Sequence, residues 1–554
     1  MKTLTNNFSF LRTSILFIAL ILCTYSSLSQ DWVRMYNGPS SGSDEGVFTC
    51  SDNQGNIYVT GTSYDQNWKC TLWKYDQSGT LIWVRTFNVA GAGYGIGKKI
   101  LLSPGGGVFI CAGVLQANLK YDFYLIKYDV NGNLQSSARY GEPAEHDNFA
   151  DASFDINGNI IVAVNGKTNI NNPDFDIILL KYNQMCVVQH YQSFKIGTWA
   201  ETAKKVLVDN AGNIYVAGER SFNSNYDLLA VKYDPQLQYI GYYTYASYND
   251  GNDFLYSAVI APAGGLILSG ATCNSTPRES DFTIIKVSQN LTYEWMSARS
   301  FVPGFAEYAN DICLDNSGNI YACGTASDTS GFNTKILTVK YNSFGNVVWS
   351  RTYDRGPGGN GYNSAKKICM DMFGNIYVAG HSASQSTDCD AMILKYDNAG
   401  NQGFVYNYNG SAFEQDEFYD ITVSPDGKIS ACGRTANLLN NAVNYDMIIV
   451  KLTGVMTGVT GNENQIPSDY SLSQNYPNPF NPGTMISFSL PKASFVKMVV
   501  YDITGKEVEI LVNEAMNAGS YEVDFNASRL TSGVYFYRIT ADGFTETKKM
   551  ILTK

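Results

Sequence analysis

The chain has 554 residues, a formal net charge of −11, 13% aromatic and 16% charged residues, and 50 glycines. This length exceeds what one hydrophobic core supports, so we expect several domains or a repeat array, and the aromatic and glycine content favours an all-β fold. The acidic balance argues against nucleic acid and anionic membrane surfaces as partners, because both require clustered Lys and Arg.

Residues 1–29 have the pattern of a secretory signal peptide, with Lys2 and Arg12 before a short apolar run and small residues at its end. The apolar run is too short for a membrane anchor, and lipoprotein processing at Cys23 would require a small residue before it. Cleavage before Gln30 removes two positive charges and changes the net charge from −11 to −13. We therefore expect an exported chain with no membrane span after signal removal.

A ten-residue motif recurs eight times, at intervals of 51 to 56 residues, and residues 209–218 are a clear copy. An Asp-x-x-Gly-Asn turn opens the motif, and an apolar strand follows it. Each repeat continues with a second apolar run, which in most repeats ends in Lys-Tyr, and with a third, aromatic run. Together with the run before the turn, these segments predict four short strands per repeat, which is the composition of a propeller blade. The other clear copies are residues 52–61, 315–324 and 371–380, and weaker copies end at Gly113, Val164, Gly270 and Gly433.

The last repeat ends near Leu452 without a fourth strand, whereas residues 31–38 match the outer strand of the first repeat at residues 82–88. We predict an eight-bladed β-propeller over residues 30–453, in which the N-terminal strand completes the last blade beside Ile449. Seven blades and one divergent copy is the alternative. The repeats resemble those of exported bacterial β-propeller proteins, and this resemblance concerns the fold rather than an activity.

Cysteines recur at one repeat position, two residues before the turn, at Cys50, Cys313 and Cys369. Such recurrence favours free, buried thiols that fill the core. Disulfide formation after export is the alternative.

Residues 454–469 have the composition of a linker, and residues 470–554 contain runs that alternate between apolar and polar residues. The alternation predicts a small antiparallel, immunoglobulin-like β-sandwich. This segment resembles type IX secretion sorting domains, which implies handling by that secretion machinery and a secreted or cell-surface location. An ordinary sugar-binding or spacer module is the alternative. The residues that carry the resemblance are Tyr476, Pro477, Asn478, Pro479, Phe480, Gly533, Tyr535, Lys548 and Lys549.

No sequence motif for catalysis, metal binding or phosphate binding is found, and the three histidines lack the spacing of metal ligands. We therefore expect no metal, no cofactor and no catalytic residue that the sequence can name. Asp129 opens a calcium-like stretch, but its glycine is in the wrong position for an EF-hand, and the stretch is better explained as a hairpin turn.

The loops that lead into the first strand of each blade vary in sequence and combine acids with aromatic residues. Such loops open onto one face of a propeller, so they are the candidate ligand-binding site. Solvated acids on an acidic protein are the alternative explanation. The candidate residues are Glu145, His146, Asp147, Trp199, Glu201, Asp250, Asp253, Glu307, Tyr308, Asp416 and Glu417.

Two functions follow from this sequence. The first is a non-catalytic binding or scaffold protein whose ligand is a glycan or a surface protein. The second is an extracellular hydrolase or lyase of polysaccharides that uses paired loop acids. A deep pocket lined by carboxylates with raised pKa values would favour the enzyme, and a shallow acidic rim would favour binding.

Overall fold

The computed structural model describes residues 29–553, apart from gaps at 142–145, 168–174, 223–224, 248–250, 274–279, 301–305, 328–332, 356–360, 384–388, 413, 425–426, 440–441, 454–468, 476–477, 493, 517–518 and 528–529. The predicted signal peptide, except for its last residue, and the predicted linker, except for Asp469, lie outside the described residues.

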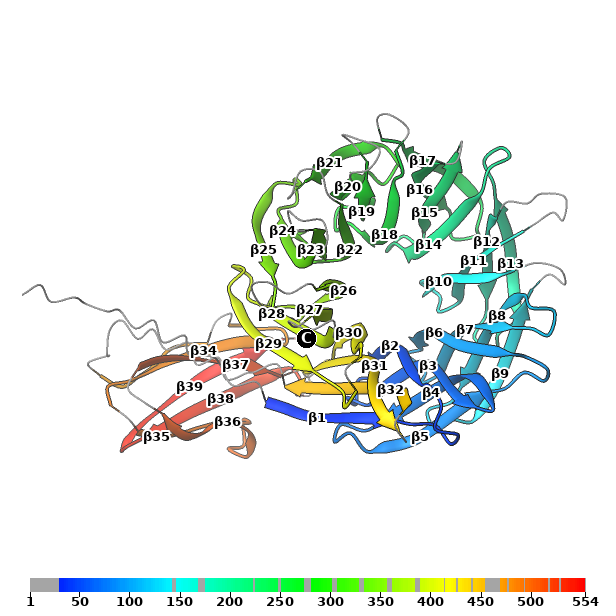
Figure 1. Ribbon diagram of the computed structural model, residues 1–554. Helices are drawn as coiled ribbons and strands as arrows, with labels where there is room; N and C mark the ends of the chain where they lie inside the picture. The colour runs from blue at the N-terminus through cyan, green and yellow to red at the C-terminus, as the bar shows by residue number, and fades with distance from the viewer. Residues whose placement is uncertain are drawn as a thin grey trace, which may run out of the picture.

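The N-terminal part consists of short strands arranged around a central opening (Figure 1). The innermost strands are β2 (Glu45–Ser51), β6 (Tyr94–Leu102), β10 (Asn148–Phe154), β14 (Glu201–Val208), β18 (Phe254–Ile260), β22 (Glu307–Leu314), β26 (Ser364–Met370) and β30 (Glu417–Val423). The second strands are β3 (Ile57–Asp65), β7 (Val108–Leu115), β11 (Ile160–Gly166), β15 (Ile214–Phe222), β19 (Leu266–Thr272), β23 (Ile320–Ser327), β27 (Ile376–Ala383) and β31 (Ile429–Leu439).

The third and fourth strands lie progressively farther from the centre (Figure 1). The third strands are β4 (Asn67–Tyr75), β8 (Tyr121–Tyr128), β12 (Asp176–Tyr182), β16 (Asn225–Tyr233), β20 (Asp281–Val287), β24 (Thr334–Tyr341), β28 (Cys389–Tyr396) and β32 (Ala442–Thr453). The outer strands are β5 (Leu81–Phe87), β9 (Leu134–Tyr140), β13 (Val188–Phe194), β17 (Tyr239–Tyr245), β21 (Tyr293–Arg299), β25 (Val347–Tyr353), β29 (Gln402–Tyr408) and β1 (Ser29–Tyr36).

The strands form antiparallel sheets that radiate from the centre, which is the arrangement of a β-propeller. Most sheets follow chain order, as in β10-β11-β12-β13, and the sheets that begin with β2 and β6 are joined by one parallel bridge between Trp68 and Tyr94. The sheet that begins with β30 takes its outer strand from the other end of the chain, since β1 pairs with β32 and places Val33 opposite Val450. We name each blade after its innermost strand.

The turn residues of the repeat act locally. In the β14 blade, Oδ1 of Asp209 accepts the backbone N–H groups of Ala211 and Asn213, and Gly212 has a φ of +83°. These bonds fix the hairpin and place the apolar run of β15 between two neighbouring blades. The side chains of Ile214 and Val216 pack with strands of the β10 blade and those of Tyr215 and Ala217 with strands of the β18 blade, so both faces of this blade are covered.

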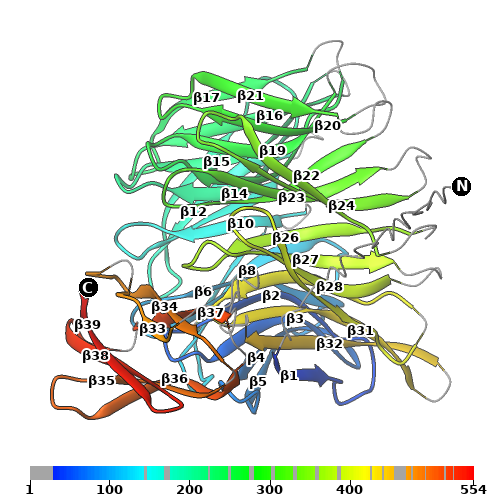
Figure 2. The same cartoon turned by 90° about the vertical axis from the view of Figure 1, so that its left-hand side faces the viewer.

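The C-terminal residues form a separate pair of sheets around one hydrophobic core, outside the ring (Figures 1 and 2). One sheet has the order β33-β34-β37 and the other β36-β35-β38-β39. Phe488 of the first sheet and Met498 of the second are fully buried in that core. The strands are β33 (Ser471–Leu472), β34 (Gly483–Leu490), β35 (Ser494–Tyr501), β36 (Glu507–Met516), β37 (Gly519–Asn526), β38 (Gly533–Ala541) and β39 (Phe544–Leu552).

All ten cysteines in the described part of the chain are free, and seven of them are buried. Burial raises the pKa of the Cys70 thiol to about 12 and raises that of the Cys111 thiol as well. In the same part of the chain, no helix has the length and apolar character needed to cross a membrane.

Candidate functional site

Every innermost strand contains a β-bulge that leaves one residue out of register with the second strand. These residues are partly or fully exposed and therefore line the central opening. The bulge residues are Val47, Lys98, Ala150, Lys204, Tyr256, Asn310, Lys366 and Tyr419.

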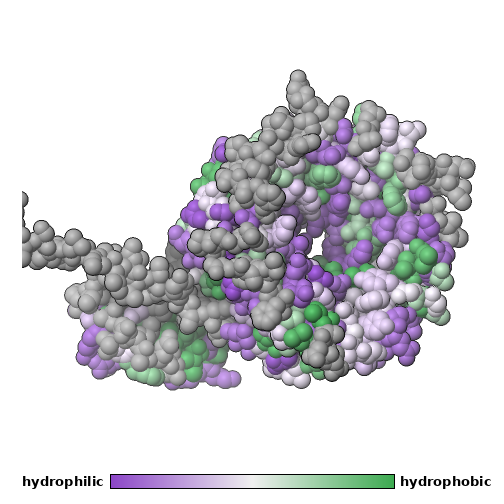
Figure 3. Space-filling model, viewed as in Figure 1, coloured by the Kyte–Doolittle hydropathy of each residue, from purple (hydrophilic) through white to green (hydrophobic). Residues whose placement is uncertain are grey.

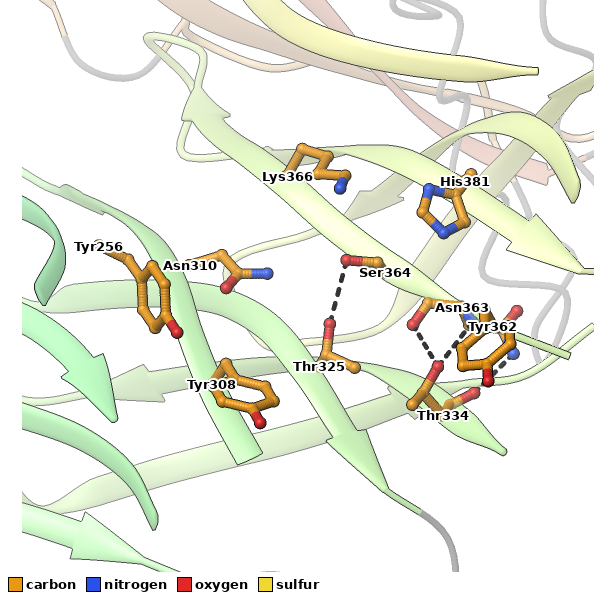
Figure 4. Close-up of a pocket in the computed structure, with 10 residues that line it drawn as sticks. All are labelled: Tyr256, Tyr308, Asn310, Thr325, Thr334, Tyr362, Asn363, Ser364, Lys366 and His381. Atoms are coloured by element: carbon orange, nitrogen blue, oxygen red, sulfur yellow. Dashed lines mark hydrogen bonds between the residues drawn. The ribbon is translucent and has the colours of Figure 1, made fainter. Parts of the chain in front are cut away.

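Three consecutive bulge residues border a pocket of about 340 Å³ formed by the β18, β22 and β26 blades (Figure 4). This volume lies at the lower end of the range of small-molecule sites. The lining residues are Tyr256, Tyr308, Asn310, Thr325, Thr334, Tyr362, Asn363, Ser364, Lys366 and His381.

The pocket combines aromatic rings with a fixed polar wall. Tyr256 and Tyr308 are in edge-to-face contact, with ring centroids 6.0 Å apart. The wall is held by Thr334, whose Oγ1 donates to the carbonyl oxygen of Asn363 at 2.8 Å and accepts the N–H of Asn363 at 2.7 Å. Tyr362, on the adjoining loop, is 67% exposed, so its ring is free to cover a ligand.

The carboxylate of Glu417 lies beside the wall of the pocket. Oε1 of Glu417 lies 2.9 Å from Nδ1 of His381 and 3.4 Å from Nζ of Lys366, and its Oε2 lies 3.7 Å from Nη2 of Arg434. Burial alone would raise the pKa of Glu417, but the hydrogen bond from His381 and the charges of His381, Lys366 and Arg434 lower it to about 2. Glu417 therefore stays ionised and contacts the His381 and Lys366 side chains of the pocket wall.

Most of the acids predicted to bind a ligand have another role. They occupy one equivalent position, three residues before the bulge residue, so the loops are more regular than their sequences suggest. At this position, Asp44, Asp147, Glu201, Asp253, Glu307 and Asp416 have no exposed surface, and Asn363 is 2% exposed.

These buried acids hold the blades together. The backbone N–H of Asp416 donates to the carbonyl oxygen of Cys389 in the preceding blade, and its carboxylate accepts the N–H groups of Gly410 and Ala436, each at 2.8 Å. Burial raises the pKa of Asp253 to about 6 and that of Glu201 to about 7. The raised pKa values therefore result from burial of carboxylates that support the loops, and they do not indicate carboxylates that face a ligand.

The remaining predicted residues are dispersed. Glu145 and Asp250 lie outside the described residues. Nδ1 of His146 accepts the backbone N–H of Tyr121, and Trp199 makes an edge-to-face contact with Phe222, so neither belongs to the pocket.

Of the predicted residues that the structure describes, only Tyr308 lines the pocket, and Glu417 contacts two residues of its wall. Sequence reasoning missed Tyr256, Lys366 and His381. An alignment of the repeats on the bulge residue would have identified Tyr256 and Lys366 as candidate site residues.

A second cavity, of about 470 Å³, lies at the outer strands β13 and β17. Aromatic residues dominate it, including Phe194, Tyr239 and Tyr242. Lys195, the one charged side chain among the described lining residues, lies 2.8 Å from the carboxylate of Asp176. This cavity offers fewer converging polar groups than the pocket at the central opening.

The residues predicted as a sorting signal join the two ends of the C-terminal domain. Oδ1 of Asn478 accepts the N–H of Ile551, and the N–H of Phe480 donates to the carbonyl oxygen of Ile551. Gly533, Tyr535, Lys548 and Lys549 lie on the paired strands β38 and β39, and Pro479 precedes the buried Phe480. Tyr476 and Pro477 lie outside the described residues.

Residues 474–553 match the family model of a secretion system C-terminal sorting domain. No curated protein matches the chain. Among solved structures, the chain is similar to PorZ, a surface component of the type IX secretion system of Porphyromonas gingivalis, with 11% identity over 94% of this chain and 76% of that one, and a TM-score of 0.35.

The chain is also similar to a polysaccharide lyase of family PL25, an ulvan lyase, with 12% identity over 69% of this chain and 97% of that one, and a TM-score of 0.38. A third similar structure is the β-propeller domain of the Trilobed protease from Pyrococcus furiosus, with 8% identity over 65% and 96% of the two chains and a TM-score of 0.38. At these TM-scores the likenesses carry no argument, and the C-terminal match is the informative one. It confirms the predicted sorting domain: the chain is a β-propeller protein that a type IX secretion sorting domain directs to the cell surface or the extracellular space.

Proposed function

We propose that the propeller is a non-catalytic glycan-binding module, and that the pocket of Tyr256, Tyr308 and Tyr362 is its binding site. The observation that supports this most directly is the composition of the pocket wall, in which three tyrosines stand beside amide, hydroxyl and ammonium groups. Aromatic faces pack against the apolar faces of sugar rings, and the polar groups bond the ring hydroxyls.

The absence of catalysis is part of the proposal. A glycosidase uses two carboxyl groups that flank the scissile bond, roughly 5 to 9.5 Å apart. No carboxylate is among the described residues that line the pocket, and the buried acids of the neighbouring loops bond backbone groups. The geometry therefore supports binding over hydrolysis.

A polysaccharide lyase is the second candidate. One observation favours it: His381 and Lys366 face the pocket, and Glu417 orients the imidazole at 2.9 Å. A base oriented in this way, beside a cation, is suited to removing a proton next to a carboxylate.

We also propose that the ring has eight blades, that β1 closes it, and that the C-terminal domain is an immunoglobulin-like sandwich. The pairing of β1 with β32 supports the closure, because it links residues 29–36 to residues 447–453. The two sheets around one core support the sandwich.

A glycan array probed with the mature chain tests the binding proposal. We expect binding that Tyr308→Ala lowers by about fivefold or more, because the loss of stacking on one aromatic ring costs on the order of 1–3 kcal/mol. Tyr293→Ala is the matched control, since Tyr293 is 53% exposed on the outer strand β21. Equal loss in both variants, or no binding to any glycan, would overturn the proposal.

Incubation of the same glycans with the chain separates the two candidates. We expect no new reducing ends and no increase in the absorbance of unsaturated products. Product formation that His381→Ala abolishes would establish the lyase instead.

A further inference from the structure

The second cavity, at the outer strands β13 and β17, is separate from the tyrosine pocket, and we call it the outer cavity. Its aromatic lining residues are Phe194, Tyr233, Tyr239 and Tyr242, none of which lines the tyrosine pocket. The two strands lie on the outer side of the ring (Figure 1). They are thus distant from the central opening, which the space-filling view shows between the side chains (Figure 3).

The register of the outer strands shows what is particular to the β14 blade. Tyr239 and Tyr242 of its outer strand pair with Tyr233 and Val231 of its third strand. In the other blades, the same two positions hold at most one aromatic residue, so the fold does not require two tyrosines here. The residues at these positions are Leu81 and Val84, Leu134 and Ser137, Val188 and Tyr191, Tyr293 and Met296, Val347 and Ser350, Gln402 and Val405, and Gln30 and Val33.

The preceding blade leaves room for these tyrosines. In the β2 blade, Arg85 of the outer strand reaches the next blade and donates to the carbonyl oxygen of Gly132. The residue of β13 in the same register is Gln192. Gln192 donates instead to the carbonyl oxygen of Ser193 on its own strand, at 3.1 Å. The space that an arginine crosses in the β2 blade is therefore part of a cavity of about 470 Å³ here.

Four aromatic rings surround the outer cavity. Phe194 and Tyr233 are buried, at 7% and 1% exposure, whereas Tyr239 and Tyr242 are 48% and 45% exposed. The ring centroid of Tyr239 lies 5.8 Å from that of Phe194 and 6.2 Å from that of Tyr233. Aromatic surface is therefore present both inside the cavity and at its rim, where it would contact an apolar face of a ligand.

The hydroxyl of Tyr233 is the polar group inside the cavity wall. It is buried and has no hydrogen-bond partner among the described residues. The equivalent hydroxyls of Tyr182, Tyr341 and Tyr396 also lack a partner, but of these four residues only Tyr233 lines one of the two cavities described above. Because an unbonded buried polar group is unfavourable, a ligand that carries a hydroxyl is preferred here over a hydrocarbon.

The charges at the outer cavity are balanced. Nζ of Lys195 lies 2.8 Å from Oδ1 of Asp176, whose side chain is buried. Lys195 is the one charged side chain among the described lining residues, so an acidic ligand gains no unpaired cation there. The tyrosine pocket differs in this respect, since Lys366 and His381 both line it. Charge complementarity therefore favours an uncharged ligand in the outer cavity.

We propose that the outer cavity binds a neutral sugar ring and is a second glycan site of the propeller. The aromatic rings contact the apolar face of the sugar, and a sugar hydroxyl bonds the hydroxyl of Tyr233. An acyl chain or an apolar side chain of a partner protein would cover the rings but leave that hydroxyl unbonded. The site shares no lining residue with the tyrosine pocket and does not depend on glycan binding there.

Affinity electrophoresis tests the site, in gels that contain hydroxyethyl cellulose, laminarin, galactomannan or arabinan as neutral polysaccharides and alginate as the acidic comparison. All chains carry Tyr308→Ala, so that failure of the tyrosine pocket does not affect the result. We expect at least one neutral polysaccharide to retard this chain, and Tyr242→Ala to weaken the binding by about fivefold or more through lost stacking. Tyr191→Ala is the matched control, because Tyr191 has the same repeat position, is 49% exposed and contacts Tyr140 of the preceding blade.

Tyr233→Phe tests the hydroxyl separately. We expect the affinity for the same polysaccharide to fall by about threefold to tenfold, because one hydrogen bond is lost. The midpoint of chemical denaturation without ligand should not fall, since the hydroxyl has no partner within the described protein. The proposal is overturned by the absence of retardation in every neutral gel, by stronger retardation in alginate, by equal losses in Tyr242→Ala and Tyr191→Ala, or by unchanged binding in Tyr233→Phe.

Discussion

The blades of this propeller are joined at their outer edges in two different ways. In the first, a tryptophan on an outer strand covers a glycine in the last turn of the next blade, as Trp349 of β25 covers Gly400. In the second, the outer strand has a smaller or polar residue, and the turn has a buried side chain in place of the glycine. We call the first kind a tryptophan joint and the second an exchanged joint. The tryptophan pairs are Trp32 with Gly79, Trp83 with Gly132, Trp295 with Gly345 and Trp349 with Gly400, and the exchanged pairs are Ser136 with Cys186, His190 with Leu237 and Gly241 with Leu291.

The two kinds of joint fill the same space from opposite sides. A Cβ on Gly400 would lie 2.7 Å from the ring of Trp349, so the ring excludes any side chain there. Where the tryptophan is missing, Leu237 and Leu291 are buried at 2% and 8% exposure and take a positive φ of 63° and 59°. A positive φ costs a leucine roughly 1–2 kcal/mol, and burying its side chain contributes about 2–3 kcal/mol, so packing prevails over backbone preference.

The tryptophan joints of Trp32, Trp83 and Trp349 also carry polar contacts from the tryptophan and from a nearby arginine. Nε1 of Trp349 donates to the carbonyl oxygen of Asn398 at 3.0 Å, and Nε of Arg351 donates to that of Gly400 at 2.7 Å. The same pair of bonds joins Trp32 and Arg34 of β1 to the first blade in the chain.

The largest expected effect comes from breaking a tryptophan joint. Trp349→Ala should lower the free energy of unfolding by about 3–5 kcal/mol, because it removes a buried ring and leaves a cavity between two blades. Chemical denaturation monitored by circular dichroism measures this change. Trp68→Ala, at a position that is 40% exposed, is the control, and an equal loss in both variants would contradict the comparison.

A somewhat smaller effect is expected from forcing both side chains into one joint. Gly400→Leu should lower the free energy of unfolding by about 2–4 kcal/mol, through overlap with Trp349 and strain at a φ of +82°. The double variant Trp349→Ser, Gly400→Leu recreates the exchanged joint and should be more stable than either single variant. Additive losses in this double-mutant cycle would show that the two residues do not share one space.

The smallest expected effect is a pH dependence of stability in two blades that lack the tryptophan joint. Glu201 begins the inner strand β14 and Asp253 precedes the inner strand β18, in the two blades that contain Leu237 and Leu291, and their pKa values are raised to about 7 and about 6. Because the folded state binds these protons more tightly, the stabilisation is present below pH 4 and is lost as pH rises toward 7. Glu201→Gln should therefore melt at a higher temperature than the natural chain at pH 8, by an amount equivalent to about 1–2 kcal/mol.

Differential scanning calorimetry at pH 4.5 and pH 8 measures this difference. At pH 4.5 the two chains should unfold at similar temperatures, because both are neutral at residue 201. A stabilisation of equal size at both pH values would point to a cause other than ionisation.

The repeats allowed the strands of the ring to be anticipated from local chemistry. Asp209 and Gly212 specify a turn through bonds between neighbouring residues, and an apolar run such as 214–217 specifies a strand covered on both faces. The sorting domain was equally accessible, because its motif lies in one continuous segment. The match between residues 31–38 and 82–88 likewise indicated where β1 would pair.

The residues of the pocket could not be predicted from the sequence in the same way. Tyr256, Asn310 and Lys366 are separated by more than fifty residues from one another, and their shared place at the opening depends on a bulge in each strand. Asp253 and Asp416 looked like loop acids available to a ligand, but burial and backbone hydrogen bonds make them links between blades.

The sequence alone determined the repeat, its turns and the route of export, because each depends on residues close together in the chain. The tertiary structure decided which side chains meet across blades: the tyrosines of the pocket, the aromatic rings of the outer cavity and the exchange of tryptophan for leucine at the joints. The physical reason is that these contacts depend on register and on the volume left by a neighbouring blade, and neither is recorded in the spacing of residues along one repeat.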